Sequence, residues 1–480
     1  MRIGRSVSAA ALVLAVAACE RSPDGIAGSQ FRPSLQSIAN PRATIGINVL
    51  LTGPVTAAQL AELNTLGTVY DQIPELNALL MRAQAGQLPA IQALPYVAGA
   101  NEDQPRGDAP VDVLTVSDFS NGLSTWDMDA VNVTVSPFTS TRSTSGFTGD
   151  GVYVGVIDTG LLDDWRLYFP EARIAAQYAT SFQGGGALDE GNVSSQPNKW
   201  EHDQNSHGTH VTSTILGYNF RGVPINGVAP KATVIPIKVL NQNGSGWSSM
   251  VAKGITYLTD LKLGPLAGHP VVGNMSLGGP ALDPLERAAI DRAVANGVIL
   301  VAAAGNAGAA GMGYPGAYPP IISVAAVGWV GQWKAYGGRS FRSWWISGDV
   351  PDPSSASDVY IAPFSSREKA GQQLDVAAPG VWTVGPYQLT SSDKISYFFL
   401  SGTSMASPHV AGIVALMAEK HPALTAGDAE TILKTSALPL PPGTATFTNT
   451  DGVTTSTVSW GANATGAGLV LADRALTATP

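Results

Sequence analysis

The sequence predicts an α/β fold in which helices cover both faces of a parallel sheet, preceded by a small α+β unit. The first observation is a set of near-continuous apolar runs separated by helix patterns, at residues 152–157, 233–240, 271–275, 298–304 and 321–327. Strands that lack polar alternation are buried on both faces, as in parallel sheets between two helix layers. The second observation is one complete helix signal, because Asp283 can cap a helix that Pro284 begins and Gly297 ends. The run 298–304 follows at once, which is typical of a β-α-β unit.

Length and composition limit the class of protein. The chain has 480 residues, which is enough for two or three domains with a large core. Its content of 44% apolar and 13% charged residues indicates a globular chain rather than a disordered one. The net charge of −9 argues against nucleic acid as a partner.

The first 19 residues have the pattern of an export signal. Arg2 and Arg5 precede an apolar stretch, residues 7–18, that is too short to span a bilayer. The single cysteine, Cys19, follows directly, and one cysteine cannot form an intrachain disulfide. The segment resembles a bacterial lipoprotein signal, which implies lipidation of Cys19 and a chain anchored to the cell envelope; plain secretion is the alternative. Residues 20–43 are polar and predict a tether.

Residues 44–107 predict a small ferredoxin-like unit. A strand pattern begins at Ile45, Thr56 can cap a helix that Gly67 ends, and a second helix-like stretch covers residues 87–94. The resulting order is β-α-β-β-α-β, which is the order of the ferredoxin-like motif.

Residues 108–125 predict a linker, because they are rich in Ser, Asp and other polar residues. The main domain is then expected over residues 126–480, starting near Trp126. It contains no run of about 18 apolar residues, so no further membrane-spanning segment is expected.

Three motifs of the main domain place reactive side chains where a strand ends or a helix begins. VGVIDTG (residues 154–160) sets Asp158 after an apolar strand, at the edge where open parallel sheets carry their sites. NSHGTHV (205–211) sets His207 at the start of a small-residue helix. LSGTSMASPHVAG (400–412) sets Ser404 at a helix N-terminus, with Pro408 expected in the first turn.

Each motif alone allows another interpretation: a turn Asp, an N-cap Ser, or a zinc pair of His207 and His210, although these two lack a Glu in the spacing that a metalloprotease needs. Taken together, Asp158, His207 and Ser404 supply a charge that orients an imidazole, a base and a nucleophile. Their order along the chain differs from that of chymotrypsin and from that of the α/β-hydrolases.

At this point the chain resembles the subtilisin-like serine proteases, over most of its length from about residue 126 to residue 476. The resemblance implies that Ser404 is the nucleophile, His207 the general base and Asp158 the residue that orients the imidazole. AAGN (303–306) is similar to the family's oxyanion segment, which implies that the Asn306 amide and the Ser404 N–H stabilise the tetrahedral intermediate.

The resemblance also implies the substrate contacts. Two segments are similar to those that hold an extended peptide between them by strand addition: Gly244, Ser245, Gly246 and Trp247 in one, and Ser276, Leu277, Gly278 and Gly279 in the other. Gly278, Gly305 and Gly313 are expected to leave the first specificity pocket open and uncharged, which implies a preference for bulky apolar side chains before the scissile bond. Trp247 is expected either to narrow a second apolar pocket or to lie at the rim of the cleft.

Under this resemblance residues 44–107 are similar to the family's inhibitory propeptide, whose polar tail lies in the cleft. Processing is expected between Gly107 and Trp126. Self-cleavage there would free the catalytic domain from a lipid anchor, so either the propeptide alone stays on the membrane or cleavage does not occur. A transpeptidase or cyclase with the same triad, and a catalytically silent binding module, remain as alternatives.

Two insertions and one altered loop depart from the family pattern. Extra chain is present at 161–199 and at 328–363, and the second insertion is aromatic: Trp329, Trp333, Tyr336, Phe341, Trp344, Trp345 and Tyr360. It predicts either a packed surface hairpin or a lid, exosite or interface patch. The segment 219–224, where the family has a calcium loop, carries Arg221 and no carboxylate. No metal is expected for catalysis, and a structural calcium ion lacks support in the sequence.

Overall fold

The computed structural model describes residues 40–107, 110–115, 125–134, 143–182, 197–333, 350–351, 354–390 and 395–480. These residues belong to one compact unit, Phe31–Pro480. The predicted export signal, Cys19 and almost all of the tether lie outside the described residues, as do parts of the predicted linker and of both insertions. None of the helices within the described residues is long and apolar enough to cross a bilayer.

The N-terminal part has the predicted β-α-β-β-α-β order. The Thr56 hydroxyl accepts from the Gln59 N–H, and the Gln59 side chain accepts from the Thr56 N–H, which caps the first helix with a reciprocal box. The four strands pair antiparallel in the order β2-β3-β1-β4, and apolar side chains from the sheet and both helices form a core of their own. The elements are β1 (Thr44–Leu51), α2 (Ala57–Leu66), β2 (Thr68–Ile73), β3 (Ala78–Gln84), α3 (Leu88–Gln92) and β4 (Val97–Glu102).

The main sheet contains all five strands that the apolar runs predict. Its order is β16-β15-β14-β13-β7-β11-β8, with β17 also paired to β15, and every pair is parallel except β15–β16. The strands are β7 (Tyr153–Asp158), β8 (Thr180–Ser181), β11 (Thr233–Lys238), β13 (Val271–Met275), β14 (Val298–Ala303), β15 (Ile322–Trp329), β16 (Val359–Ile361) and β17 (Val376–Pro379). The predicted class, an α/β fold with a largely parallel sheet, is confirmed.

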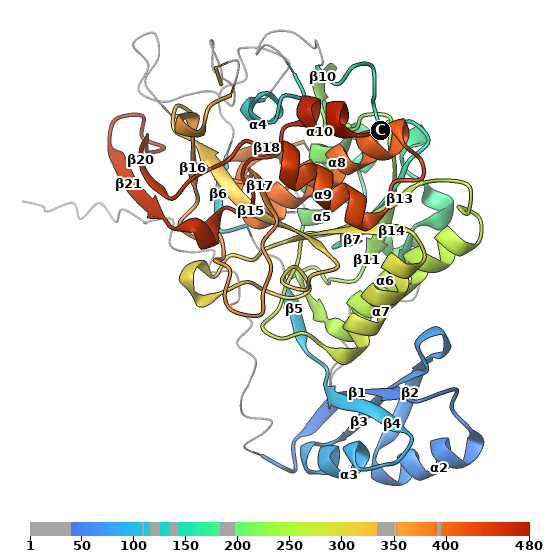
Figure 1. Cartoon of the computed structure of the whole chain (residues 1–480). Helices are drawn as coiled ribbons and strands as arrows, with labels where there is room; N and C mark the ends of the chain where they lie inside the picture. Colours follow the sequence, from blue (N-terminus) through green and yellow to red (C-terminus); the bar gives the residue numbers. More distant parts are fainter. Residues whose placement is uncertain are drawn as a thin grey trace, which may run out of the picture. The chain divides into compact units, whose positions relative to one another are not determined.

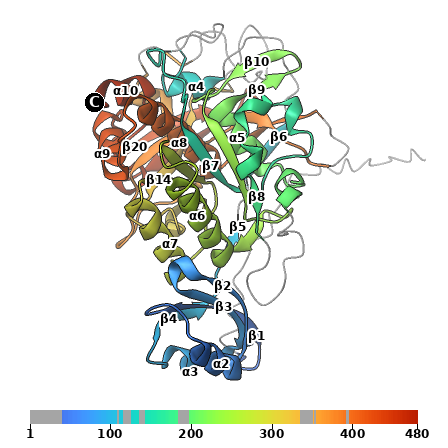
Figure 2. The ribbon, with the colours of Figure 1, turned by 90° about the vertical axis from the view of Figure 1, so that its right-hand side faces the viewer.

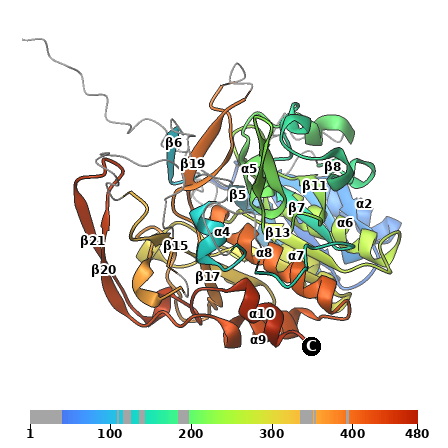
Figure 3. The ribbon, with the colours of Figure 1, turned by 90° about the horizontal axis from the view of Figure 1, so that it is seen from above.

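Helices cover both faces of this sheet. Along β7, Val156 belongs to a buried cluster with α5 (His207–Leu216) and α8 (Thr403–Lys420), whereas Ile157 belongs to a second cluster with α6 (Ser248–Leu263) and α7 (Pro284–Ala295). Successive side chains of a strand point to opposite faces, so the two clusters are the two helix–sheet interfaces. Helices α6 and α7 run side by side (Figures 1 and 2), and α10 (Ala472–Ala478) lies against both α8 and α9 (Ala426–Ser436) (Figure 3).

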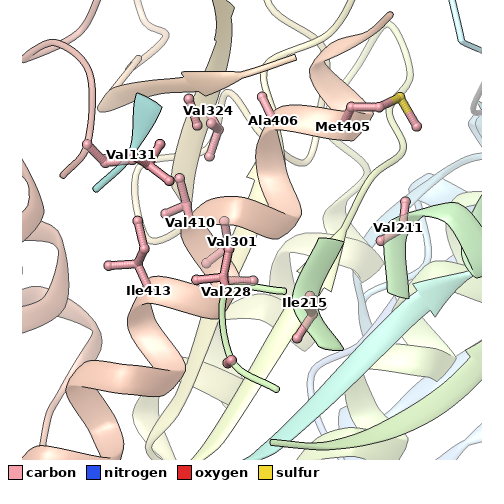
Figure 4. Close-up of a cluster of buried hydrophobic side chains, with 14 of the residues drawn as sticks. Val131, Val211, Ile215, Val228, Val301, Val324, Met405, Ala406, Val410 and Ile413 are labelled. Carbon is pink, nitrogen blue, oxygen red and sulfur yellow. The ribbon is translucent and has the colours of Figure 1, made fainter. Parts of the chain in front are cut away.

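The helix that carries Ser404 is anchored by its apolar side. Val410 and Ile413 of α8 are fully buried together with Val301 of β14 and Val228, as Figure 4 shows. The predicted helix at Ser404 is present. Because interiors are packed as densely as organic crystals, the packing fixes where the N-terminus of α8 lies relative to the sheet.

Short strands outside the main sheet were not predicted. Within the expected linker, β6 (Asp112–Thr115) pairs antiparallel with β19 (Tyr397–Ser401), which also pairs with β18 (Thr383–Pro386). Near the C-terminus, β20 (Gly443–Thr448) and β21 (Thr455–Trp460) form the antiparallel hairpin labelled in Figure 3.

The described part of the aromatic insertion is packed rather than exposed. Trp329 stacks on Trp126 with ring centroids 6.4 Å apart, and Trp333 meets Trp382 and Phe399 edge-on. Tyr360 of β16 stacks on Phe447 of the C-terminal hairpin at 4.1 Å. This part fits the packed interpretation, while Tyr336, Phe341, Trp344 and Trp345 lie outside the described residues.

Candidate active site

Asp158 and His207 are brought together at the carboxyl edge of the sheet. Asp158 is the last residue of β7 and His207 the first of α5, and both are fully buried. His207 Nδ1 lies 2.9 Å from Asp158 Oδ1 and 3.1 Å from Oδ2. A carboxylate only accepts, so Nδ1 carries the proton and Nε2 is left with its lone pair. The imidazole therefore has the tautomer of a general base.

A tight helix–strand junction sets this geometry. A Cβ on Gly208 would lie 2.3 Å from the Gly160 carbonyl oxygen and 3.2 Å from Asp158 Oδ1, so the start of α5 can approach the end of β7 only with glycine there. The Gly208 N–H donates to Thr159 Oγ1 at 2.8 Å, and the Thr159 N–H donates to Asp158 Oδ1 at 2.7 Å.

Three further polar residues support the junction, and the motifs did not single them out. Thr159 Oγ1 donates to Asp203 Oδ2 at 2.8 Å, and Lys238 donates to the Thr159 carbonyl. Burial raises the pKa of Asp203, and the Lys238 ammonium opposes that shift. The sequence did contain a signal, because Lys238 is a charged residue within an apolar run.

Ser404 is the second residue of α8 and is only 3% exposed. Its hydroxyl donates to the Ser276 carbonyl at 2.9 Å, and its own carbonyl accepts from Ser276 Oγ at 2.8 Å. The expectation that Pro408 lies in the first turn is wrong, because α8 begins at Thr403 and Pro408 lies in its second turn. A residue there would normally donate to the Ser404 carbonyl, and proline has no N–H to give. The Ser276 hydroxyl supplies the missing donor.

Asn306 is held with a defined amide orientation. Its Oδ1 accepts from the Thr403 N–H and from Thr403 Oγ1, both at 2.9 Å, and Thr403 Oγ1 accepts from the Gly305 N–H at 3.1 Å. Because Oδ1 faces α8, the Nδ2 donors face the other way. Asn306 and Ser404 are thereby joined through one residue, Thr403.

The three glycines assigned to the first specificity pocket gather at one place. A Cβ on Gly305 would lie 3.2 Å from the Gly313 nitrogen, and a Cβ on Gly278 would lie 3.9 Å from the Gly313 Cα. Leu277, between Ser276 and Gly278, is instead buried in the core with α6 and α7.

The two predicted substrate segments hold a strand of the chain itself. Strand β5 (Pro105–Gly107) pairs antiparallel with β12 (Ser245–Trp247), with Gly246 opposite Arg106. On its other side Gly107 exchanges two backbone hydrogen bonds with Gly278, at 3.0 and 3.2 Å. Gly244, which precedes β12, has φ +70° and turns the chain into this strand.

The second histidine of the NSHGTHV motif has a separate partner. His210 Nε2 lies 3.2 Å from the Thr383 carbonyl, and burial lowers the pKa of His210 to about 3, with His207 adding to the effect. Among the described residues, no group of three His, Cys, Asp or Glu side chains is placed to hold a metal ion.

The segment that stands where the family has a calcium loop is a tight hairpin. Strands β9 (Gly217–Phe220) and β10 (Val223–Asn226) are joined by Arg221 and Gly222, with φ of +47° and +93°. Two central residues with positive φ make the type I′ turn that fits a two-residue hairpin.

A parallel sheet between two helix layers, an Asp–His pair at its carboxyl edge, and a serine at a helix N-terminus together define the class of the subtilisin-like serine endopeptidases. Residues 149–466 match the model of the Subtilase family (Peptidase_S8), and the chain belongs to this family.

Individual relatives agree with this assignment. Subtilisin DY from Bacillus licheniformis is 36% identical over 297 residues, which cover 61% of this chain and 85% of that protein. Subtilisin E from Bacillus subtilis (strain 168) is 34% identical over 296 residues, which cover 61% of this chain and 62% of that protein. The crystal structure of fervidolysin from Fervidobacterium pennivorans, a keratinolytic enzyme related to subtilisin, has the same fold, with a TM-score of 0.61, 23% identity, and coverage of 91% of this chain and 61% of that chain. The chain thus spans less than two thirds of subtilisin E and of fervidolysin.

Proposed function

We propose that the protein is an exported serine endopeptidase, made as a zymogen, that hydrolyses peptide bonds through Asp158, His207 and Ser404. The observation that carries the proposal is the buried Asp158–His207 hydrogen bond, in a site where Ser404 starts a helix and a peptide strand already lies between β12 and Gly278. Nucleophile, base and strand-binding edges are the parts that an acyl-transfer site needs.

The proposed reaction begins with a rotation of the Ser404 hydroxyl, which donates to the Ser276 carbonyl in this structure. Turned toward His207, it passes its proton to Nε2 as Oγ bonds to the substrate carbonyl carbon, while Asp158 stabilises the imidazolium. The oxyanion receives hydrogen bonds from Asn306 Nδ2 and the Ser404 N–H, aided by the positive end of α8. The C–N bond then breaks and His207 protonates the leaving amine. Water, deprotonated by His207, next attacks the acyl-enzyme, and His207 returns that proton to Ser404 Oγ as the ester bond breaks and the acid product leaves.

Labelling with a fluorophosphonate probe tests the nucleophile. The chain should be labelled and should release peptides from casein, and Ser404→Ala should lose both properties. Product masses distinguish hydrolysis, which adds water, from transpeptidation or cyclisation, which joins the acyl group to an amine. A correctly folded chain that takes no label after removal of residues 44–107 contradicts the proposal.

Residues 44–107 act as an intramolecular inhibitor in this proposal. The support is the location of β5, which occupies the strand position between β12 and Gly278 where a substrate would bind. N-terminal sequencing provides the test: active enzyme should begin between Gly107 and Trp126, whereas Ser404→Ala should keep its original start. An identical start in both chains excludes self-cleavage.

The proposed first pocket takes a bulky apolar side chain. Its support is the proximity of Gly278, Gly305 and Gly313, which leave room and bring no charge. Peptides that differ only in the residue before the scissile bond should be cleaved fastest with Phe, Tyr or Leu there. Equal rates for Asp, Lys and Phe at that position contradict the proposed pocket.

Cys19 is the proposed site of a lipid anchor. Metabolic labelling with a fatty-acid analogue should mark the wild-type chain and leave Cys19→Ala unmarked. Marking of both chains places the lipid elsewhere, and an unmarked wild type indicates secretion without an anchor.

A further inference from the structure

Strand β5, which lies between β12 and Gly278, carries an arginine, Arg106, whose side chain is fully buried. Arg106 Nε donates to Glu286 Oε1 at 3.1 Å and Arg106 Nη2 donates to Glu286 Oε2 at 2.6 Å, with both side chains 0% exposed. Arg106 Nη2 also donates to the Ala281 carbonyl at 3.0 Å. This is the paired fork geometry that a carboxylate offers to a guanidinium and not to an ammonium.

The partners of Arg106 belong to the main domain and form a site shaped for its side chain. Glu286 is the third residue of α7, and Ala281 lies just before that helix. Gly279 makes room, because a Cβ there would lie 2.4 Å from the Pro105 carbonyl oxygen and 2.5 Å from Arg106 Nη1. Burial acts to lower the pKa of Arg106, but the charge and hydrogen bonds of Glu286, together with the smaller effect of Asp283 at the N-cap of α7, raise that pKa overall.

The register of β5 fixes where this site lies relative to the reacting bond. Gly107 is paired with Gly278, so in an antiparallel ladder a bound peptide places the residue two positions later opposite Ser276. The Ser276 carbonyl accepts the Ser404 hydroxyl, so that later residue lies beside the nucleophile. The position of Arg106, opposite Gly246, is therefore three residues before the residue whose carbonyl is attacked.

We propose that Glu286, with the Ala281 carbonyl and the space over Gly279, forms a subsite that selects arginine three residues before the residue at the scissile carbonyl of a substrate. This inference rests on the proposed function, because it takes β5 as the stand-in for a substrate strand. The pocket at this position is acidic, whereas an apolar second pocket narrowed by Trp247 was one of the two expectations from the sequence. A carboxylate left buried without its cation is costly, so a neutral side chain at that position binds less well than arginine.

Three otherwise identical fluorogenic peptides test the subsite, with Phe at the scissile carbonyl and arginine, citrulline or norleucine three residues earlier. Citrulline keeps the shape of arginine and lacks its charge. Enzyme purified after expression of the full chain should show kcat/KM at least tenfold higher for the arginine peptide than for either neutral peptide.

Variants assign that preference to Glu286. Glu286→Gln should bring the arginine-to-citrulline ratio close to one, and Glu286→Leu should reverse the arginine-to-norleucine ratio. Arg287→Gln is the matched control, because Arg287 is the exposed neighbour on the same helix, and its ratios should equal those of the wild type. If either Glu286 variant fails to fold with Arg106 left unpaired, Arg106→Met/Glu286→Leu provides the same comparison with a neutral pair.

The outcomes separate the subsite from the proposed function. Enzyme that is labelled by the fluorophosphonate but cleaves the three peptides at equal rates, or keeps its preference for arginine in Glu286→Leu, overturns the subsite alone. Absence of labelling together with absence of cleavage overturns the proposed function and the subsite with it.

Discussion

The hydroxyl of Thr403, together with the Thr403 N–H, holds the Asn306 amide in one orientation. The hydroxyl donates to Asn306 Oδ1 and accepts from the Gly305 N–H, so one side chain joins residues 305–306 to the first turn of α8. In the proposed mechanism the donor is useful only if it is fixed before charge develops on the substrate oxygen. Thr403 is thus expected to act through Asn306.

Replacing Thr403 tests this coupling. Thr403→Val keeps the shape and removes the hydroxyl, and it should lower kcat about tenfold, the value of one hydrogen bond of about 1.5 kcal/mol. Thr403→Ser is the matched control and should stay close to wild type. The ratio of the two kcat values, with KM little changed, is the measurement; equal kcat values for Val and Ser contradict the coupling.

Removing the donor itself should have a larger effect. Asn306→Ala should lower kcat by about 10²–10³ with a small change in KM, a magnitude carried over from the same donor in a subtilisin and not inferred from this chain. Steady-state kinetics on one peptide measures it. A loss that falls on KM instead would place Asn306 in ground-state binding.

At the residue scale the candidate residues could be named from the sequence, whereas the contacts that support them could not. Asp158, His207 and Ser404 stand in compact motifs, and Asn306 was named through the resemblance to the family. The hydrogen bond from the Ser276 hydroxyl to the Ser404 carbonyl could not be predicted, because it joins residues 128 positions apart. It also depends on Pro408 lying in the second turn of α8, whereas the sequence predicted the first turn. The same holds for Asp203, whose partner Thr159 lies 44 residues away.

At the scale of elements, the start of α8 has a hydrogen bond that comes from outside the helix. Ser276→Ala should remove the donor that replaces the N–H absent from Pro408, leaving a buried carbonyl unsatisfied at a cost of about 1–3 kcal/mol. In a Pro408→Ala background the helix supplies its own N–H, so the same change should cost less. Urea unfolding of the four chains, in a Ser404→Ala background that prevents self-digestion, measures the coupling. Equal costs in both backgrounds contradict it.

Helix α5 carries a pH dependence of its own. His210 is buried with its pKa lowered from 6.5 to about 3, so the unfolded chain binds a proton in this interval that the folded chain does not. Stability supplied by neutral His210 is therefore complete above about pH 6.5 and is lost as pH falls toward 3, at up to about 1.4 kcal/mol per pH unit.

The variant His210→Gln should flatten that dependence. Free energies of unfolding between pH 6.5 and 4, again in a Ser404→Ala background, should fall less steeply for Gln than for His, even if Gln lowers the value at pH 7. Parallel curves for the two chains exclude His210 as the group responsible.

Elements with strong local patterns were predictable and short pairing strands were not. The five apolar runs and the cap of α7 by Asp283 specify their elements from within. Strand β6 and the hairpin β20–β21 owe their strand conformation to a partner. Strand β6 lies within the predicted linker, and no strand was predicted for residues 443–460.

For the molecule as a whole, the N-terminal unit meets the main domain through buried polar contacts. Asn48 Nδ2 donates to Asp283 Oδ2 at 2.8 Å, and Asp103 Oδ1 accepts from the Ser249 N–H near the start of α6 at 3.0 Å. Arg106 and Glu286 add a buried ion pair to the same contact region.

Loss of one member of that ion pair should be far more harmful than loss of both. In a Ser404→Ala background, Arg106→Met alone should cost about 3–5 kcal/mol because it leaves Glu286 buried and unpaired. Arg106→Met/Glu286→Leu should recover most of this loss, as measured by urea unfolding. Additive costs would show that the pair is solvated rather than buried.

The segment that contains Gly107 and Val111 is hydrogen-bonded to the main domain at two places near Ser404. Gly107 is paired with Gly278 on one side, and on the other the Val111 N–H donates to the Ser401 carbonyl at 2.5 Å. A strand tethered in this way has an effective concentration of the order of millimolar, which a dilute free peptide does not match. Under the proposed zymogen function, loss of this strand is a first-order step within each molecule, so the lag before activity should be the same at nanomolar and micromolar protein. A lag that shortens as the protein concentration rises would contradict this and would show that active molecules cut their neighbours.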